Sequence, residues 1–202
     1  GSVWLTAKTL AGTGTIRANG GFRGVGQETR GGAGGRVSVM LTEAGADPAT
    51  FGGKITAYAY LNTATGRPNV SECGTVYLQR GGEQLGCGTV VVANDPLSPA
   101  TNFIGTLLPS ATAVRELRKA TLVIRAKAGV RLLADLVVKD IRLEDATSRL
   151  DLDGKVLSIR SSYRDYSADR EKILNAGEWQ GGEKPGYANV KWGVPGLAIF
   201  FR

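Results

Sequence analysis

Short runs in which apolar and polar residues alternate recur along the chain, most regularly between residues 121 and 160. Residues 149–153 read Arg-Leu-Asp-Leu-Asp, for example. Successive side chains of a β-strand point to opposite faces, so an alternation of period two predicts strands with one buried face.

The same window contains an internal repeat, because residues 121–140 align with residues 141–160 at an offset of 20. The alignment places apolar residues together at five positions: Val123 with Leu143, Ala126 with Ala146, Val130 with Leu150, Leu132 with Leu152, and Leu136 with Val156. A unit of this length with three short strands matches one coil of a solenoid, which completes its core when the next coil stacks on it.

We therefore predict parallel strands over most of residues 1–160 and an all-β fold of the solenoid type. The side chains predicted to face inward are Val123, Leu143, Val130, Leu150, Leu132 and Leu152. An antiparallel sandwich whose strands are similar by accident is the alternative.

The first half of the chain repeats a looser unit, in which Gly and a polar residue precede Val, any residue and an apolar residue. It occurs at Gly1–Leu5, Gly35–Val39, Gly74–Leu78 and Gly88–Val92, with partial copies at Gly14–Ile16 and Gly53–Ala57. Because the spacing varies, we predict inserted loops at residues 20–35, 62–72 and 94–110.

Residues 161–202 depart from the repeat and are predicted to close the same continuous domain. A short helix is expected over Ala168–Ala176, with Ser167 as its N-cap and Gly177 at its end. Strand character returns at Ala188–Trp192 and Leu197–Phe201.

Glycine is the outlier of the composition, with 29 residues, about twice the usual share of roughly 7%. Without a three-residue period this density predicts many tight turns. The runs at residues 21–26 and 31–35 precede no helical pattern, so they indicate loops between coils in place of a nucleotide cradle.

The net charge of +7 is spread over both halves of the chain, with no basic block. This distribution argues against a nucleic-acid partner, and it leaves attraction to an acidic polysaccharide or an anionic cell envelope open. No apolar run approaches the about 18 residues that a membrane span needs.

The chain has no histidine, which excludes Ser-His-Asp and Cys-His nucleophile systems and most zinc sites. We predict no catalytic residue, no cofactor and no metal ion. Asp151 and Asp153, expected on one strand face, are the remaining candidates for a Ca²⁺ site or a glycosidase pair. The favoured interpretation is a solvent face, with Asp151 beside Arg131 in a charge ladder between coils. The scattered Trp and Tyr residues indicate no site.

The run Gly1–Leu10, followed by Gly12–Ile16 and Ala18–Gly21, resembles the repeats of large bacterial surface proteins with pectin-lyase-like, right-handed parallel β-helices. Gly32–Val37 and Ser148–Gly154 fit the same resemblance, which covers roughly residues 1–160. Such proteins are usually adhesins or envelope components, while relatives on the same fold cleave acidic polysaccharides. The resemblance implies an extracellular or cell-surface location and does not choose between these functions.

Cys73 and Cys87 precede the near-identical strands Gly74–Leu78 and Gly88–Val92. Matching positions on adjoining strands, in an extracellular fold, predict a disulfide between them. Two unpaired thiols are the alternative.

The function expected from the sequence is a non-enzymatic structural module of a bacterial surface or extracellular assembly. We expect self-association, coil on coil, because the sequence begins directly in a strand unit. The predicted contact residues are Val3, Trp4 and Leu5 at one end and Trp192, Phe200 and Phe201 at the other. The alternative is a carbohydrate-active domain that binds or cleaves acidic polysaccharide.

Overall fold

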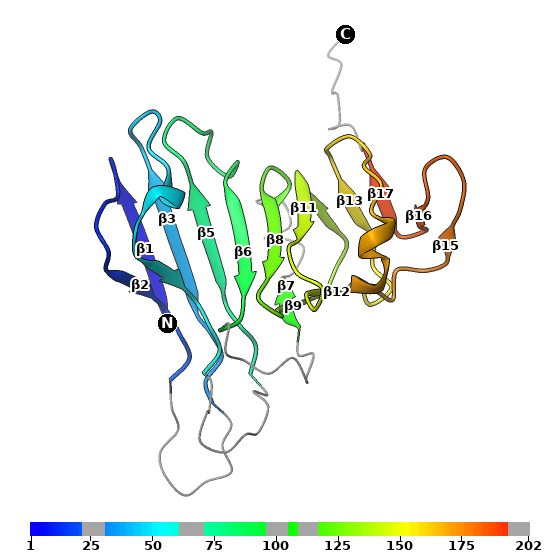
Figure 1. Ribbon diagram of the computed structural model, residues 1–202, viewed down its shortest axis with the longest axis horizontal. Coiled ribbons are helices and arrows are strands. Elements are labelled where there is room, and N and C mark those ends of the chain that lie inside the picture. Colours follow the sequence, from blue (N-terminus) through cyan, green and yellow to red (C-terminus); the bar gives the residue numbers. More distant parts are fainter. Residues whose placement is uncertain (22–30, 61–70, 96–104, 109–116, 194–202) are drawn as a thin grey trace, which may run out of the picture.

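The computed structural model describes residues 1–21, 31–60, 71–95, 105–108 and 117–193 (Figure 1). The all-β prediction is confirmed, since strands dominate and the two short 3₁₀ helices are η1 (Pro48–Thr50) and η2 (Ser167–Lys172). In chain order the strands are β1 (Ser2–Ala7), β2 (Thr15–Arg17), β3 (Arg36–Leu41), β4 (Lys54–Thr56), β5 (Thr75–Gln79), β6 (Thr89–Ala93), β7 (Thr106–Leu108), β8 (Thr121–Arg125), β9 (Gly129–Leu132), β10 (Leu136–Val138), β11 (Asp140–Leu143), β12 (Arg149–Asp151), β13 (Leu157–Ile159), β14 (Ile173–Leu174), β15 (Trp179–Gln180), β16 (Gly186–Tyr187) and β17 (Val190–Trp192).

The largest sheet has six strands in the order β1-β3-β5-β6-β8-β11, which lie side by side in Figure 1. Beside it are sheets of order β14-β12-β9-β7, β10-β13-β17 and β2-β4, and the hairpin β15-β16. Neighbouring strands are parallel in all of these pairs except β5–β6 and β15–β16. The predicted parallel pairing therefore holds for most of the described strands.

The 20-residue repeat corresponds to two successive layers of the chain, β8-β9-β10 and β11-β12-β13. The offset of 20 is correct for the middle strands, where Val130 pairs with Leu150. It is wrong for the outer strands: Leu122 pairs with Ile141, an offset of 19, and Leu136 pairs with Leu157, an offset of 21. The corners between strands differ in length from one layer to the next, which shifts the register by one residue.

Because a shift of one residue exchanges the two faces of a strand, the prediction for Val123 is wrong. Val123 pairs with Arg142 and packs on the opposite face of the sheet from its neighbours Leu122 and Ile124. The predicted inward positions Leu143, Val130, Leu150, Leu132 and Leu152 are confirmed as buried together.

The buried apolar residues form two cores on opposite faces of the six-stranded sheet. The larger core consists of Cys73, Val90, Val92, Leu108, Ala120, Leu122, Ile124, Ala128, Val130, Leu132, Leu136, Val138, Ile141, Leu143, Leu150, Leu152, Leu157, Ile159, Tyr166, Ile173, Ala176 and Val190. The smaller core consists of Val37, Val39, Leu41, Ala57, Val76, Val91 and Val123. In β6 and β8 the central residue belongs to the smaller core and its neighbours to the larger one, so both faces are buried.

The antiparallel pair β5–β6 marks the change from one core to the other. After β1 and after β3 the chain turns toward β2 and β4, which cover the smaller core. After β5 it folds straight back as β6, with Tyr77 opposite Val90. The tight return includes Gly82 and Gly86, both with positive φ, and the next layers build on the other face.

The glycine that opens each repeated unit of the first half lies against the backbone of the preceding layer. A Cβ on Gly35 would collide with the carbonyl of Gly1, and a Cβ on Gly74 with the carbonyl of Gly35. The parallel ladder runs through the same groups, since Thr75 donates its N–H to the Gly35 carbonyl. The repeated Gly is thus required by the close stacking of layers.

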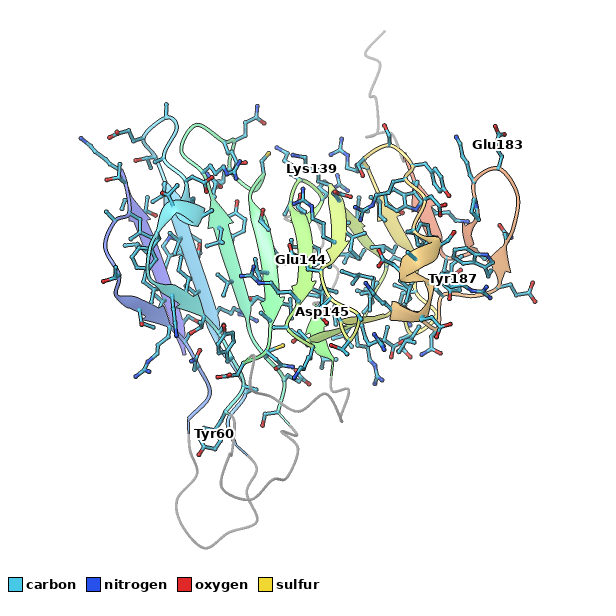
Figure 2. All side chains as sticks on the ribbon, viewed as in Figure 1. Tyr60, Lys139, Glu144, Asp145, Glu183 and Tyr187 are labelled. Atoms are coloured by element: carbon cyan, nitrogen blue, oxygen red, sulfur yellow. The ribbon has the colours of Figure 1, made fainter. Side chains whose placement is uncertain are left out.

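The C-terminal end of the larger core is closed by aromatic side chains, which include the labelled Tyr187 in Figure 2. Tyr166 packs edge-on against Trp179 and lies 5.6 Å from Trp192, measured between ring centroids. The predicted helix is shorter than expected, since η2 ends at Lys172 and β14 follows at once. Ser167 is not its N-cap, because Tyr166 holds that position.

The predicted loops fall mostly outside the described residues, and so does the predicted strand Leu197–Phe201. The range 94–110 was predicted as loop but contains β7, which pairs with β9. Three residues sufficed to form this strand, too few for the alternation pattern to indicate it.

Candidate functional site

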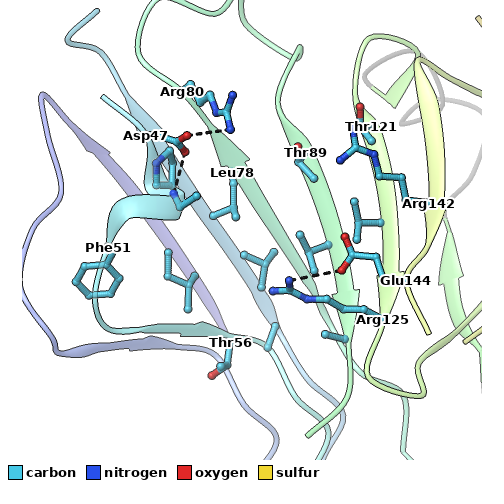
Figure 3. Close-up of a pocket in the computed structure, with 18 of the residues that line it drawn as sticks. Asp47, Phe51, Thr56, Leu78, Arg80, Thr89, Thr121, Arg125, Arg142 and Glu144 are labelled. Atoms are coloured by element: carbon cyan, nitrogen blue, oxygen red, sulfur yellow. Dashed lines mark hydrogen bonds and ion pairs between the residues drawn. The ribbon is translucent and has the colours of Figure 1, made fainter. Parts of the chain in front are cut away.

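A groove lies where the two-stranded sheet β2–β4 stops while the six-stranded sheet continues (Figure 3). A third strand beside β4 would follow β5 if the first-half pattern went on, but the chain returns as β6 instead. The resulting groove has a volume of about 540 Å³. Its floor is the outer face of β5, β6 and β8, and its wall is the segment from η1 to β4.

The floor and wall of the groove combine buried apolar side chains with threonines and charged residues. Val91 and Val123 in the floor are 6% and 4% exposed. Val76 and Leu78 continue the floor toward β4, and the wall contributes Phe51, Ile55 and Ala57. The floor residues share one face because each strand is paired in register with the next, Val76 with Val91 and Val91 with Val123.

Charged side chains line the rim of the groove in pairs (Figure 3). Arg80 lies 2.8 Å from Asp47, and Arg125 lies 3.7 Å from Glu144, each between nitrogen and carboxylate oxygen. Asp47 also accepts a hydrogen bond from the Ala49 N–H, which fixes it as the cap of η1. These carboxylates are engaged with arginines, an arrangement suited to shaping the groove and unlike a free acid–base pair.

Two further cations reach the groove from the β11 side. Lys139 and Arg142 both line it, and Arg142 lies 4.0 Å from Asp140. Burial raises the pKa of Tyr58, which lines the wall, and the Asp95 carboxylate adds to the rise. Tyr58 is therefore a neutral hydrogen-bonding group at neutral pH.

Asp151 and Asp153 do not form the predicted pair on one strand face. β12 ends at Asp151, and Asp153 follows in a turn with φ of 47°. Asp151 is 2% exposed and accepts hydrogen bonds from Arg131 Nε (2.9 Å), Asn175 Nδ2 (2.8 Å) and the Asp153 N–H (2.9 Å). The charge ladder from Arg131 to Asp151 is confirmed, but the predicted solvent face is wrong for Asp151, whose carboxylate is buried between layers.

The hydrogen bonds that Asp151 accepts also stabilise its ionised form. Burial opposes ionisation of this carboxyl, but the bonds from Asn175, the Asp153 backbone and Arg131 outweigh it and lower the pKa. Because Asn175 and Arg131 lie in the layers after and before β12, the ionised carboxylate joins three layers. Its role is structural.

A second carboxylate of this kind, Asp145, lies at the corner after β11 and was not indicated by any sequence pattern (Figure 2). Its oxygens accept hydrogen bonds from the backbone and hydroxyl groups of both Thr147 and Ser148, and from the Lys127 N–H of the preceding layer. Although burial acts in the opposite direction, the bonds from Ser148 and Thr147 hold the pKa of Asp145 far below its ordinary value.

The predicted disulfide is wrong for this structure, in which Cys73 and Cys87 are both free. β5 and β6 are antiparallel, so residues that precede the two strands lie at opposite ends of the pair. At about 3.3 Å per residue the separation is roughly 20 Å, far beyond bridging distance. Cys73 lies in the larger core beside Thr106, whereas Cys87 lines the groove.

The predicted contact residues at the two ends have different surroundings. Val3 and Leu5 are half-buried against the smaller core, while Trp4, on the other face of β1, is 75% exposed. Trp192 packs against the larger core with Tyr163 and Tyr166. Phe200 and Phe201 lie outside the described residues.

Comparison with known proteins gives no match to a family model, a curated protein or a solved structure. Within the described ranges, no group of three or more Cys, Asp or Glu side chains is placed to hold a metal ion. The helices of that part of the chain are too short and too polar to span a bilayer.

Proposed function

We propose that the chain is a non-enzymatic structural module with a right-handed parallel β-helical architecture, part of a bacterial surface or extracellular assembly. The observation that carries the proposal is the layer-on-layer pairing of β8, β9 and β10 with β11, β12 and β13. A chain that winds through three parallel sheets in each layer presents long, rigid faces, which is what a structural module needs.

The uses of the carboxylates support a structural role. Asp151 and Asp145 are saturated by donors from their own and adjacent layers. Asp47 and Glu144 at the groove pair with arginines. A polysaccharide hydrolase would need two carboxylates facing a shared space on either side of the substrate.

Assembly through the β1 edge belongs to the same proposal. The backbone groups of Ser2, Trp4 and Thr6 point away from β3, because Gly1 and Ala7 are the residues that bond to it. No strand among the described residues pairs with this side of β1. Unpaired strand edges of this kind pair readily with another chain.

Binding of an acidic polysaccharide is the second candidate, and the groove is the observation that favours it. Arg80, Arg125, Lys139 and Arg142 all line the groove, beside Phe51 and Tyr58, whose rings suit sugar stacking. This candidate concerns binding, since Asp47 and Glu144 pair with arginines and Glu83 accepts a hydrogen bond from the Arg80 N–H.

The test combines two measurements on the purified 202-residue chain. Sedimentation velocity over a range of concentrations is expected to show self-association, and incubation with polygalacturonate is expected to release no oligosaccharides. Release of products by the protein, abolished in a Glu144→Gln variant, would replace the structural proposal with a catalytic one. Retardation in a polygalacturonate gel without cleavage, lost in Arg125→Glu, would favour the second candidate.

A further inference from the structure

The described chain has several sheet edges with no strand beside them, and two of these edges can meet in self-association. The first is β1, described above. The second is β4, where Lys54 and Thr56 bond to the β2 segment through the Gly14 carbonyl and the Ala18 N–H. The N–H and C=O of Ile55 therefore point to the opposite edge, over the groove, and no strand of the described residues pairs there.

One hydrogen bond within the chain already uses this edge of β4. The Ala57 carbonyl, on the same edge as Ile55, accepts a hydrogen bond from the Gly74 N–H of the next layer. The next layer therefore begins in hydrogen-bonding contact with the end of β4. It then continues as β5 and returns as β6, without forming a strand beside β4. A strand-wide position is left beside β4, above the valines of the floor.

The strand that could fill this position is β1, which carries the exposed side chain of Trp4. It is 75% exposed, although a large aromatic side chain is normally at least partly covered. The face of β1 that carries Val3 and Leu5 is covered by the chain's own β2–β4 sheet. Only the face with Trp4 is free to meet another surface.

We propose that β1 of one copy lies along β4 of a second copy, as the third strand of the β2–β4 sheet, with Trp4 over Val91 and Val123. This contact rests on the self-association in the proposed function and specifies the two surfaces that meet. It continues an existing sheet, pairs two open edges and gives the most exposed tryptophan a groove to occupy. Arg125 at the rim also lies where it can stack on the indole ring.

The C-terminal end is a poorer acceptor for the β1 edge. β11 is the last strand of the six-stranded sheet, and its outward carbonyls are already used. Arg164 donates to the Ile141 carbonyl, and Lys172 Nζ donates to the Leu143 carbonyl at 3.2 Å. Since the β1 and β4 edges are different surfaces, the contact is heterologous and extends copy by copy unless its rotation closes a ring.

Sedimentation velocity of the full chain tests the contact with two variants and a matched control. Trp4→Ser removes the proposed aromatic contact of β1. Thr89→Lys places a charged side chain in the groove floor, where Thr89 is half-buried. Leu85→Ser is the control, because Leu85 is also 75% exposed but lies in the β5–β6 turn. We expect each of the two variants to weaken association at least about tenfold, as loss of a central aromatic contact does, and the control to leave it unchanged.

Circular dichroism and thermal melting establish that each variant is folded, and Ala93→Lys replaces Thr89→Lys if the latter is not. If the chain associates and Trp4→Ser weakens it while both groove variants do not, the groove is not the acceptor and the assembly proposal stands. A chain that is monomeric at every concentration overturns the contact and the assembly together. Groove variants that reduce only polygalacturonate binding assign the groove to a glycan and overturn the contact.

Discussion

Asp151 joins three successive layers through one carboxylate, which makes it the most consequential polar side chain of the described core. Replacing it with alanine leaves Arg131, Asn175 and the Asp153 N–H without their acceptor. We expect Asp151→Ala to lower the free energy of unfolding by about 3 kcal/mol, since bonds to a buried charge are costly to leave unmade.

Urea unfolding at neutral pH measures the effect. Asp153→Asn is the matched control, because Asp153 lies two residues on, is exposed, and has a positive φ that Asn tolerates. Equal losses in both variants would show that Asp151 does not join the layers in the way described.

Asp145 predicts how stability depends on pH. Its pKa in the folded protein lies below the ordinary 3.8, so the unfolded chain takes up the proton more readily. The stability it contributes is therefore complete above about pH 5 and is lost as the pH falls below about 4 toward the folded pKa. We expect the free energy of unfolding to fall more steeply over that acidic range in the wild-type chain than in Asp145→Asn, measured by urea titration at several pH values. Parallel slopes would contradict the assignment.

The two cysteines are expected to differ in reactivity. Cys73 is 4% exposed, and burial raises the pKa of its thiol, whereas Cys87 is half-buried at the groove. In the native protein we expect a maleimide to modify Cys73 at least about tenfold more slowly than Cys87. Peptide mass mapping resolves the two sites, and intact mass without reductant should show two free thiols. A mass lower by two hydrogens would restore the disulfide.

At the scale of elements, the close approach of layers depends on glycine at the start of a strand. A methyl group at residue 74 would collide with the Gly35 carbonyl, whose bond to Thr75 belongs to the parallel ladder. We expect Gly74→Ala to destabilise the protein by about 2 kcal/mol, as overpacking typically does. Gly14→Ala is the control, because nothing lies within contact distance of its added Cβ. Thermal or urea unfolding of both variants measures the difference, and a neutral Gly74→Ala would contradict the stacking argument.

The β11 edge is protected by side chains in place of a strand. Lys172, whose side chain is 15% exposed, donates to the Leu143 carbonyl and pairs with Asp169 at 2.7 Å. Replacing it with methionine keeps the length and removes the donors. We expect Lys172→Met to lose about 1 kcal/mol of stability and to aggregate more readily at the exposed edge.

Light scattering during incubation, together with urea unfolding, measures both effects. Lys191→Met serves as the control, since Lys191 is exposed on β17 and its side chain makes no hydrogen bond or ion pair with the described part of the chain. Similar behaviour of the two variants would mean that Lys172 does not protect the edge.

At the scale of the whole molecule, the sequence predicts the strands and most of the buried positions but not the path between them. Alternation identified Leu150 and Leu152 as buried because the side-chain period is local. The register of Val123 was missed because it depends on corner lengths, which no residue pattern measures. The offset of 20 was correct only for β9 and β12, because the offset between paired positions grows by one residue at each corner, from 19 through 20 to 21.

The reversal of chain direction between β5 and β6 was not predicted, and it explains two further errors. Gly74–Leu78 and Gly88–Val92 have the same pattern, and a pattern of alternating faces is identical when read in either direction. The sequence therefore did not distinguish parallel from antiparallel neighbours, and the disulfide followed from the wrong choice. The groove was unforeseen for the same reason, since it exists only where the reversal ends the β2–β4 sheet.

That reversal also divides the polypeptide in a way that could be exploited. Most of the described apolar residues before residue 80 belong to the smaller core, Cys73 being an exception, and most of those after residue 88 belong to the larger one, while β5 and β6 remain hydrogen-bonded across the boundary. A backbone break within residues 81–86 would leave each fragment with most of its own apolar partners and a shared seam of four residue pairs. The molecule thus has the organisation of a split reporter: two separately synthesised pieces whose reunion depends on one antiparallel ladder.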